Sequence, residues 1–294
     1  MPHSVACVAE TRVSMEHIEW LQGIVLGIIQ GLTEFLPVSS SAHIEILSRV
    51  FGWGDPGAAF TAVTQIGTET AVIIYFWKDI TKIISAWFRS LYQAEARKVP
   101  EARLGWFVLL GSLPIGILGL LFKDHIETTA RNLWIVASAL IVMGIVLGLA
   151  DRIAKHLKSI EDLNPKNAVA FGIGQALALI PGVSRSGATI SFGLFMGFKR
   201  EVAARYSFLL AIPAVLASGL LELVKVVNDP AVQWPVTLVA TVVAFFVGYW
   251  VISTLMKYLV SGSFMPFVIY RIALGLALMA WLYFGKHSGT PPVG

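Results

Sequence analysis

Apolar residues occur along this chain in long runs that are separated by short polar connections. Six runs approach about 20 residues, the length that a helix needs to cross the hydrocarbon core of a bilayer. We predict a membrane-spanning helix for each. These runs lie near residues 58–77, 104–122, 133–150, 203–224, 235–256 and 265–284. Between the first two of them, Lys78 to Arg103 forms a charged, amphipathic connection.

Two further apolar stretches are too short or too interrupted to span a bilayer comfortably. Residues 18–36 are rich in glycine and end at Pro37, and 39–51 follow without a loop. The same arrangement returns at 167–180 and 184–198. We predict that each pair forms a re-entrant helical hairpin. Ten ordinary spans are the alternative, and the Gly and Pro interruptions argue against it.

The two broken stretches are related copies, once a single inserted glycine, Gly182, is allowed. Three spans, an odd number, separate them, so the second copy is expected to be inverted in the membrane relative to the first. The aligned pairs are Gln30 with Gln175, Pro37 with Pro181, Val38 with Val183, Ser39 with Ser184, and Ser41 with Ser186. The predicted fold is an all-α integral membrane protein built as an inverted-topology repeat.

The predicted organisation is one polytopic membrane domain, residues 17–294, behind a polar extension, residues 1–16. The first repeat covers about 17–122 and the second about 167–285.

Composition supports this class. Hydrophobic residues make up 56% of the chain and charged residues 14%, against about a quarter in soluble domains. Mean hydropathy is +0.74 and the isoelectric point is near 9.2. The basic residues lie in short loops beside apolar runs, so they indicate membrane topology and not a nucleic-acid surface. One cysteine, Cys7, excludes an internal disulfide and a multi-cysteine metal site.

The distribution of Lys and Arg predicts the orientation. Six lie on the side that holds the N-terminus, fourteen lie on the other side, and Arg185 and Arg271 lie within the membrane, which accounts for all 22. Cytoplasmic loops carry the excess of positive charge. We therefore expect both termini, and the mouth of the first hairpin, to face outward.

The two breaks combine features of an anion site. A helix that begins after each proline offers free backbone N–H groups and a partial positive charge. Hydroxyls and the Arg185 guanidinium suit the oxygens of a phosphate or diphosphate. The candidate hydroxyls are Ser39, Ser40, Ser41, Ser184, Ser186 and Thr189. Helix capping by Ser39 or Ser184, or back-bonding by Thr189, is the plainer alternative.

Other side chains in the breaks carry reaction chemistry. Ser40 and His43 are spaced i, i+3, so they share a helix face, and a hydroxyl beside an imidazole is a minimal activated nucleophile. Gln30 and Glu34 are spaced i, i+4 and are candidate ligands for a divalent cation; alternatively, Glu34 orients His43. Arg185 would stabilise a transferring phosphoryl group, or would form a structural ion pair with Glu34.

Four more ionisable residues fall within the predicted spans. We expect Glu45 and Glu222 to be mostly structural, because they lie near span ends. Glu69 and Arg271 lie deeper, and Arg271 is a candidate second phosphate clamp.

Two long motifs give the chain a close resemblance to a known family. Gln30-x-x-x-Glu34 precedes Pro37-Val-Ser-Ser-Ser-x-His43, and Pro181-Gly-Val-Ser-Arg-Ser-Gly-Ala-Thr189 follows downstream. Together they resemble the undecaprenyl-diphosphate phosphatases, also called bacitracin-resistance proteins, over about residues 17–285. The resemblance implies a hydrolase of the bacterial cytoplasmic membrane that acts at the outer face and recycles a lipid carrier for peptidoglycan.

The resemblance also implies roles for individual residues. Glu34, Ser40, His43 and Arg185 match the essential residues of the family; Gln30, Ser39, Ser184, Ser186 and Thr189 match supporting ones. A divalent cation, Mg²⁺ or Ca²⁺, is implied as cofactor. Gln30 replaces a glutamate of many relatives, which weakens a two-carboxylate metal site, and Ala42 replaces a frequent glycine.

The expected reaction is hydrolysis of a polyprenyl diphosphate, with Ser40 as nucleophile and His43 as general base and then acid. A phosphohistidine at His43 is the alternative within this class. A transporter of an anion or polyprenyl phosphate, and a bacitracin-binding or scaffold protein without turnover, are the other readings. The bilayer and the lipid substrate are the expected partners. The spacing of Gly23, Gly27 and Gly31 permits close helix packing within one chain or in a homodimer.

Overall fold

The computed structural model describes residues 20–54, 56–122, 132–227 and 232–285. These residues form eleven α-helices, three short 3₁₀ helices and no strand. The α-helices are α1 (Trp20–Thr33), α2 (Ser40–Val50), α3 (Gly57–Tyr75), α4 (Trp77–Tyr92), α5 (Pro100–Leu121), α7 (Leu133–Ile153), α8 (Pro165–Ala176), α9 (Arg185–Phe195), α10 (Arg200–Val226), α11 (Trp234–Tyr258) and α12 (Met265–Phe284). The 3₁₀ helices are η1 (Glu95–Lys98), η2 (Ile160–Asp162) and η3 (Leu177–Leu179). The prediction of an all-α fold is confirmed; the predicted extension, residues 1–16, lies outside the described residues.

Five of the six predicted spans are long, apolar helices: α5, α7, α10, α11 and α12. The remaining stretch, predicted as 58–77, forms the 19-residue helix α3, which is not among the helices apolar enough to cross a membrane by length and composition. Polar side chains at Gln65, Thr68, Glu69 and Thr70 explain the difference, because they interrupt the hydrocarbon character of α3 in its middle.

Both predicted interruptions of the helices are present. The first break (residues 34–39) separates α1 from α2, and the second break (residues 177–184) separates α8 from α9. Each break ends in a serine with positive φ, 77° at Ser39 and 72° at Ser184. Glycine is the residue that usually adopts this conformation, so the breaks place two serines in a costly backbone geometry.

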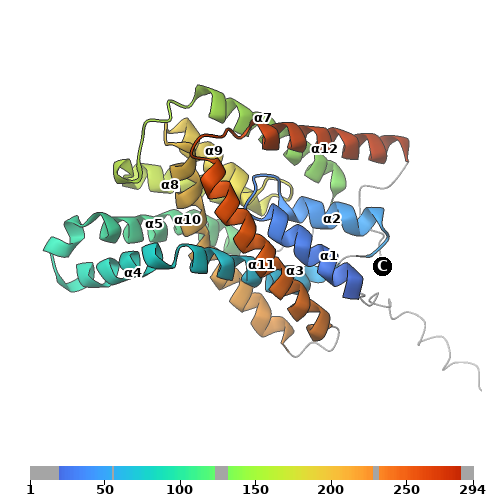
Figure 1. The fold of residues 1–294 in the computed structure, drawn as a ribbon, viewed down its shortest axis with the longest axis horizontal. Helices are drawn as coiled ribbons and strands as arrows, with labels where there is room; N and C mark the ends of the chain where they lie inside the picture. Colours follow the sequence, from blue (N-terminus) through green and yellow to red (C-terminus); the bar gives the residue numbers. More distant parts are fainter. Residues whose placement is uncertain (1–19, 55, 123–131, 228–231, 286–294) are drawn as a thin grey trace, which may run out of the picture.

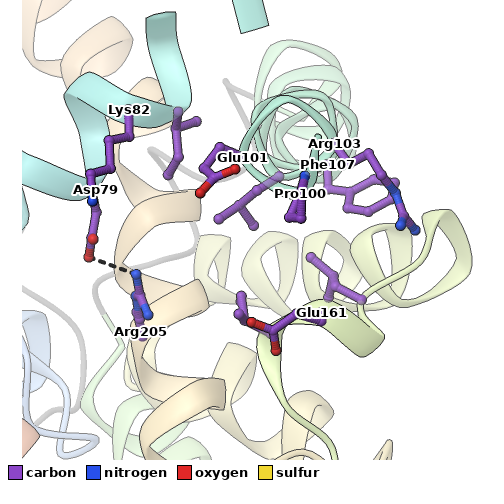
Figure 2. Close-up of a pocket in the computed structure, with 12 residues that line it drawn as sticks. Asp79, Lys82, Pro100, Glu101, Arg103, Phe107, Glu161 and Arg205 are labelled. Carbon is purple, nitrogen blue, oxygen red and sulfur yellow. Dashed lines mark ion pairs between the residues drawn. The ribbon is translucent and has the colours of Figure 1, made fainter. Parts of the chain in front are cut away.

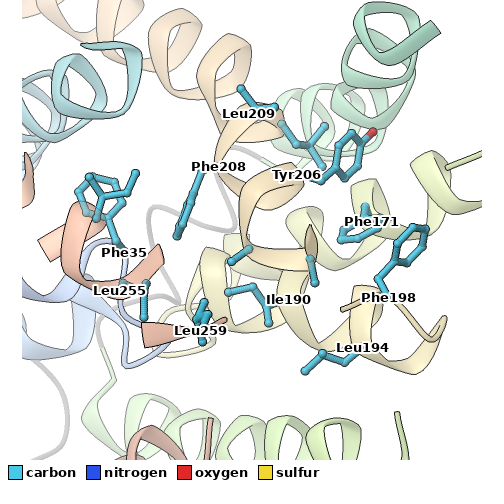
Figure 3. Close-up of a cluster of buried hydrophobic side chains, with 14 of the residues drawn as sticks. Phe35, Phe171, Ile190, Leu194, Phe198, Tyr206, Phe208, Leu209, Leu255 and Leu259 are labelled. Atoms are coloured by element: carbon cyan, nitrogen blue, oxygen red, sulfur yellow. The ribbon is translucent and has the colours of Figure 1, made fainter. Parts of the chain in front are cut away.

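The helices cross around the two breaks (Figure 1). Helix α1 packs along α11, α5 along α8, α3 against both α10 and α11, and α7 along α12. The largest apolar cluster joins these elements at the centre of the molecule. In Figure 3, Phe35 of the first break lies beside Phe208 of α10 and near Leu255 of α11, and the Phe35 and Phe208 rings meet edge to face with centroids 5.6 Å apart.

The glycine stripe of α1 is used within this chain. A Cβ on Gly27 would lie 2.5 Å from the carbonyl oxygen of Ala240, and Gly23 and Gly31 face α11 in the same way. Only a residue without a side chain permits the two backbones to approach so closely. Packing inside one chain therefore accounts for this glycine stripe. The homodimer stays a prediction, and the glycine stripe gives it no support.

A buried carboxylate ties three helix ends together. The Asp151 side chain, 2% exposed, lies near the end of α7 and pairs at 2.6 Å with Arg200 Nε, at the start of α10. Its other oxygen accepts the backbone N–H of Phe264, which precedes α12, at 3.1 Å. A sequence-based search for charged groups at membrane depth does not find this residue, because it lies at the end of a run.

We expect Asp151→Ala to destabilise the protein by about 3 kcal/mol. The Arg200 guanidinium and the buried N–H of Phe264 would both lose the carboxylate that accepts their hydrogen bonds. The thermal unfolding midpoint of detergent-solubilised protein should fall accordingly. Glu95→Ala is the matched control, because that carboxylate is 85% exposed and its ion pair with Lys98 lies at the surface. Equal midpoints for the two variants would contradict the role assigned to Asp151.

Candidate active site

The two breaks contact each other directly. The Ser186 hydroxyl, at the start of α9, donates to the carbonyl oxygen of Leu36 in the first break at 3.2 Å. Arg271 of α12 donates to Pro37 of the first break at 2.9 Å, and to Gly182 and Val183 of the second break at 2.9 and 3.0 Å. Residues from two distant parts of the chain therefore form one centre.

The serines of the two breaks have the same local geometry. Ser39 accepts a hydrogen bond from the backbone N–H of Ala42, and Ser184 accepts one from that of Gly187. The hydroxyl oxygens of Ser39 and Ser41 lie 3.2 Å apart, as do those of Ser184 and Ser186. Both Ser39 and Ser184 are thus N-caps, which is the plainer of the two roles considered for them.

Glu34 is at the centre of the polar groups. It is 8% exposed, and its carboxylate accepts three hydrogen bonds: from Ser40 Oγ at 2.7 Å, from Gln30 Nε2 at 2.9 Å and from an Arg185 terminal nitrogen at 2.9 Å. Ser40 as a whole residue is half-buried. This is the arrangement in which a buried carboxylate can remove a proton from a hydroxyl nucleophile.

A second carboxylate approaches the Arg185 nitrogen that pairs with Glu34. One Glu69 oxygen is 3.8 Å from Arg185, while the other is buried and has no hydrogen-bond partner among the described residues. The second terminal nitrogen of Arg185 is likewise buried and unpartnered within the described part of the chain. Sequence reasoning placed Glu69 at membrane depth and gave it no role; its contact with Arg185 adds it to the site.

His43 contacts a different partner from the one expected. Its Nδ1 lies 2.7 Å from the carbonyl oxygen of Ser39, and its Nε2 lies 2.7 Å from the Tyr270 hydroxyl. The two rings stack with an interplanar angle of 6°. Because a carbonyl oxygen can only accept, Nδ1 carries a proton, and in a neutral ring Nε2 accepts from the tyrosine. The Ser40 hydroxyl, by contrast, donates to Glu34.

Sequence reasoning missed Tyr270. Its one signal is a hydroxyl-bearing residue directly before the buried Arg271 in an otherwise apolar span. The residue is 46% exposed, so it connects the buried imidazole with the surface of the protein.

We expect Tyr270→Phe to lower kcat for the reaction proposed below by about 10-fold with little change in KM, because it removes one hydrogen bond from His43 and keeps the stacking. Steady-state kinetics of Tyr270→Phe, Tyr270→Ala and Tyr283→Phe would test this. The Ala variant should lose more activity, since the stacked ring is absent as well. Tyr283, exposed near the end of α12, is the control. Unchanged kcat in both Tyr270 variants would remove the residue from the site.

Other predicted phosphate ligands are engaged in holding the breaks. Thr189 donates to the carbonyl oxygen of Arg185 and contacts the Ser207 hydroxyl. Arg271 is fully buried, and its hydrogen bonds all run to backbone carbonyls. Phosphate binding by these side chains stays a prediction, and in the geometry described here their donors and acceptors organise the backbone of the two breaks.

The predicted cation ligands lie together, and their chemistry fits a hard cation. Glu34 and Gln30 are hydrogen-bonded, and the amide oxygen of Gln30 is buried without a donor among the described residues, as is one oxygen of Glu69. Unpartnered buried oxygens beside a carboxylate suit Mg²⁺, which is commonly held by one or two carboxylates and substrate phosphates. Three or more His, Cys, Asp or Glu residues do not converge anywhere in the described ranges, so the fit depends on substrate oxygens.

Comparison with known proteins identifies the family of this chain. A family model described as bacitracin resistance protein BacA matches residues 23–277. The chain is 56% identical to undecaprenyl-diphosphatase 2 of Streptomyces avermitilis, over 92% of this chain and 97% of that protein. It is 55% identical to undecaprenyl-diphosphatase 2 of Streptomyces coelicolor, with the same coverage, and 54% identical to the undecaprenyl-diphosphatase of Renibacterium salmoninarum, over 93% and 99%. The resemblance inferred from the two motifs is confirmed, and the chain belongs to the bacitracin resistance protein BacA family.

Proposed function

We propose that this chain is an undecaprenyl-diphosphatase, which converts undecaprenyl diphosphate and water into undecaprenyl phosphate and inorganic phosphate. The observation that carries the proposal is the 2.7 Å hydrogen bond from Ser40 to Glu34, whose other oxygen pairs with Arg185. A nucleophile, a base and a cationic group for phosphoryl transfer thus lie in one cluster. The names of relatives more than 50% identical to the chain support it.

In the proposed first step, Ser40 Oγ attacks the distal phosphorus while its proton passes to Glu34. The bond from that phosphorus to the bridging oxygen breaks, undecaprenyl phosphate leaves, and a phosphoserine remains. In the second step, water attacks the phosphorus of the phosphoserine, the bond from that phosphorus to Ser40 Oγ breaks, Glu34 returns its proton to Oγ, and inorganic phosphate leaves. We assign the abstraction of the Ser40 proton to Glu34 instead of His43, because the hydroxyl donates to the carboxylate.

His43 keeps a proton-transfer role in this scheme. It lies in the first turn of α2, as Ser40 does, and through Tyr270 it is linked to the surface. We propose that the ring, when Nε2 is protonated as well, supplies a proton through the Tyr270 hydroxyl to the departing undecaprenyl phosphate, and that the attacking water of the second step returns it.

Arg185 has the geometry of a charge-stabilising group. Its side chain is 14% exposed, and one of its terminal nitrogens lies 2.9 Å from Glu34 and 3.8 Å from Glu69. The unpartnered terminal nitrogen would donate a hydrogen bond to the phosphate of the substrate. The same donor would stabilise the negative charge that develops on the phosphoryl oxygens.

A divalent cation, Mg²⁺ or Ca²⁺, is part of the proposal. Glu34, Gln30 and Glu69 would hold it, and when bound it would neutralise charge on the diphosphate.

The proposed architecture is an inverted repeat of about 17–122 and 167–285 in the cytoplasmic membrane, with α3 as a sixth span and both breaks re-entrant. The helix contacts support it: α1 packs on α11 as α8 packs on α5, and α3 packs on α11 as α10 packs on α5. The distribution of basic residues favours outward-facing termini and an active site at the outer leaflet.

Phosphate release from undecaprenyl diphosphate by purified protein in detergent tests the function. We expect release with Mg²⁺ or Ca²⁺, and its loss when a chelator removes the cation. Full activity in excess chelator would overturn the cation assignment. Binding of the diphosphate without release of phosphate under either condition would favour a transporter or a scaffold protein over an enzyme. Neither of these requires the Ser40–Glu34 pair.

A further inference from the structure

A polar cavity lies away from the two breaks, between the starts of α4, α5 and α10 and the short helix η2 (Figure 2). Its volume is about 260 Å³. Charged groups of both signs line it. The cations are Lys82, Arg103 and Arg205, and the carboxylates are Asp79, Glu101 and Glu161. None of these residues belongs to the proposed active site.

The charges in this polar cavity are incompletely paired. Arg205 pairs with Asp79 at 2.8 Å, but its Nε is buried and has no hydrogen-bond partner in the described part of the chain. Within the same residues Lys82 and Glu101 form no ion pair, and the Arg103 guanidinium lies over the Phe107 ring, 5.7 Å from its centroid. Cationic and anionic groups that face a cavity without partners can bind a ligand that carries both charges.

An apolar groove adjoins the polar cavity. It has a volume of about 370 Å³ and is lined by side chains of α4, α5 and α10, among them Trp87, Leu109 and Ile212. Ile83 lines both the polar cavity and the apolar groove, so the two are neighbours. The walls of the groove are hydrocarbon almost throughout, which suits an aliphatic chain.

Along α10, the residue that lines the polar cavity comes first and the residues that line the apolar groove follow it. Arg205 lies near its beginning, and Leu209, Ile212 and Leu216 follow at intervals of four, three and four residues, which places them on one face. Leu216 lies 11 positions after Arg205, which corresponds to about 16 Å of helix, or about half the thickness of the hydrocarbon core. A charged end followed by an apolar path of this length matches one leaflet of a bilayer.

We propose that the polar cavity and the apolar groove together bind one zwitterionic phospholipid, whose headgroup carries a phosphate and an ammonium, as in phosphatidylethanolamine. The three cations would face the phosphate, the carboxylates would face the ammonium, and one acyl chain would lie along α10. A purely anionic headgroup fits less well, because Asp79, Glu101 and Glu161 would face it with like charge. That argument disfavours polyprenyl phosphate and phosphatidylglycerol as occupants.

Native mass spectrometry of the purified, delipidated protein tests the proposal. Phosphatidylethanolamine, phosphatidylglycerol and undecaprenyl phosphate are titrated separately. We expect one phosphatidylethanolamine to bind at least 10-fold more tightly than the other two at a site that Lys82→Ala/Arg103→Ala weakens at least 10-fold. Leu109→Trp should weaken the same binding by filling the groove. Lys155→Ala is the control, because that lysine is exposed and lines neither part of the site.

Phosphate release by each variant in detergent shows that the variants are folded, since these residues lie outside the active site. Binding of phosphatidylethanolamine by the double variant as tightly as by the wild type would overturn the site. Equal or tighter binding of either anionic lipid at this site would overturn the choice of a zwitterion. Failure of phosphate release in the wild type would bear on the proposed function alone.

Discussion

Replacing Ser40 by alanine is expected to lower phosphate release from undecaprenyl diphosphate by about 10⁴-fold or more, which is the effect typical of removing a nucleophile. The hydroxyl is the one that donates to Glu34, and its residue is half-buried. Substrate binding should persist, because Arg185 and the helix N-termini remain. Single-turnover phosphate release and a separate binding assay would measure both effects.

Ser41→Ala is the matched control, since that hydroxyl is exposed and contacts Ser39. We expect its effect to be less than 3-fold. Activity of Ser40→Ala above a tenth of the wild type would rule out Ser40 as nucleophile. A trapped phosphoenzyme provides an independent check: an acid-stable label indicates phosphoserine, and an acid-labile one indicates that His43 is the nucleophile.

Glu34→Gln is expected to lower kcat by about 10³-fold, within the range for loss of a general base. The variant keeps the size of the side chain but cannot take the Ser40 proton, and it leaves Arg185 without its closest negative partner. His43→Gln should cost less, because His43 does not receive the hydrogen bond of Ser40. Measuring kcat for both variants, and the unfolding midpoint of each, separates chemistry from folding.

Glu45→Gln is the control for Glu34→Gln, because Glu45 is a partly buried carboxylate of α2 whose partner is Arg49 at 2.7 Å. Its kcat should stay near that of the wild type. If His43→Gln abolished activity while Glu34→Gln remained active, the base would be His43, as its spacing from Ser40 first suggested.

The positions of the two breaks could be predicted because they depend on local chemistry. Pro37 and Pro181 interrupt helices by their own covalent structure, and the serines that follow are N-cap residues. The inserted Gly182 has a φ of +85°, and a Cβ at this position would lie 2.7 Å from the carbonyl oxygen of Val136. Both the backbone conformation and the close approach therefore favour glycine here. Ser39 and Ser184, which align in the sequence, are both N-cap residues in the structure.

The partner of Ser40 could not be predicted from spacing. The i, i+3 rule applies inside a helix, but Ser40 is the first residue of α2, and its hydroxyl reaches back across the first break to Glu34. The conformation of an irregular segment does not follow from periodicity. Glu69 contacts Arg185 and His43 contacts Tyr270, although these pairs are 116 and 227 positions apart in the sequence. Periodicity along one helix does not predict contacts between residues so far apart.

Arg271 has a consequence for how the molecule can move. Its guanidinium binds Pro37 of one break, Gly182 and Val183 of the other, and carbonyl groups of α7. Drawing the breaks apart would take from a buried cation the carbonyl acceptors of one break or the other, which is costly in hydrocarbon surroundings. We therefore expect motions of the protein to keep the two breaks together at Arg271.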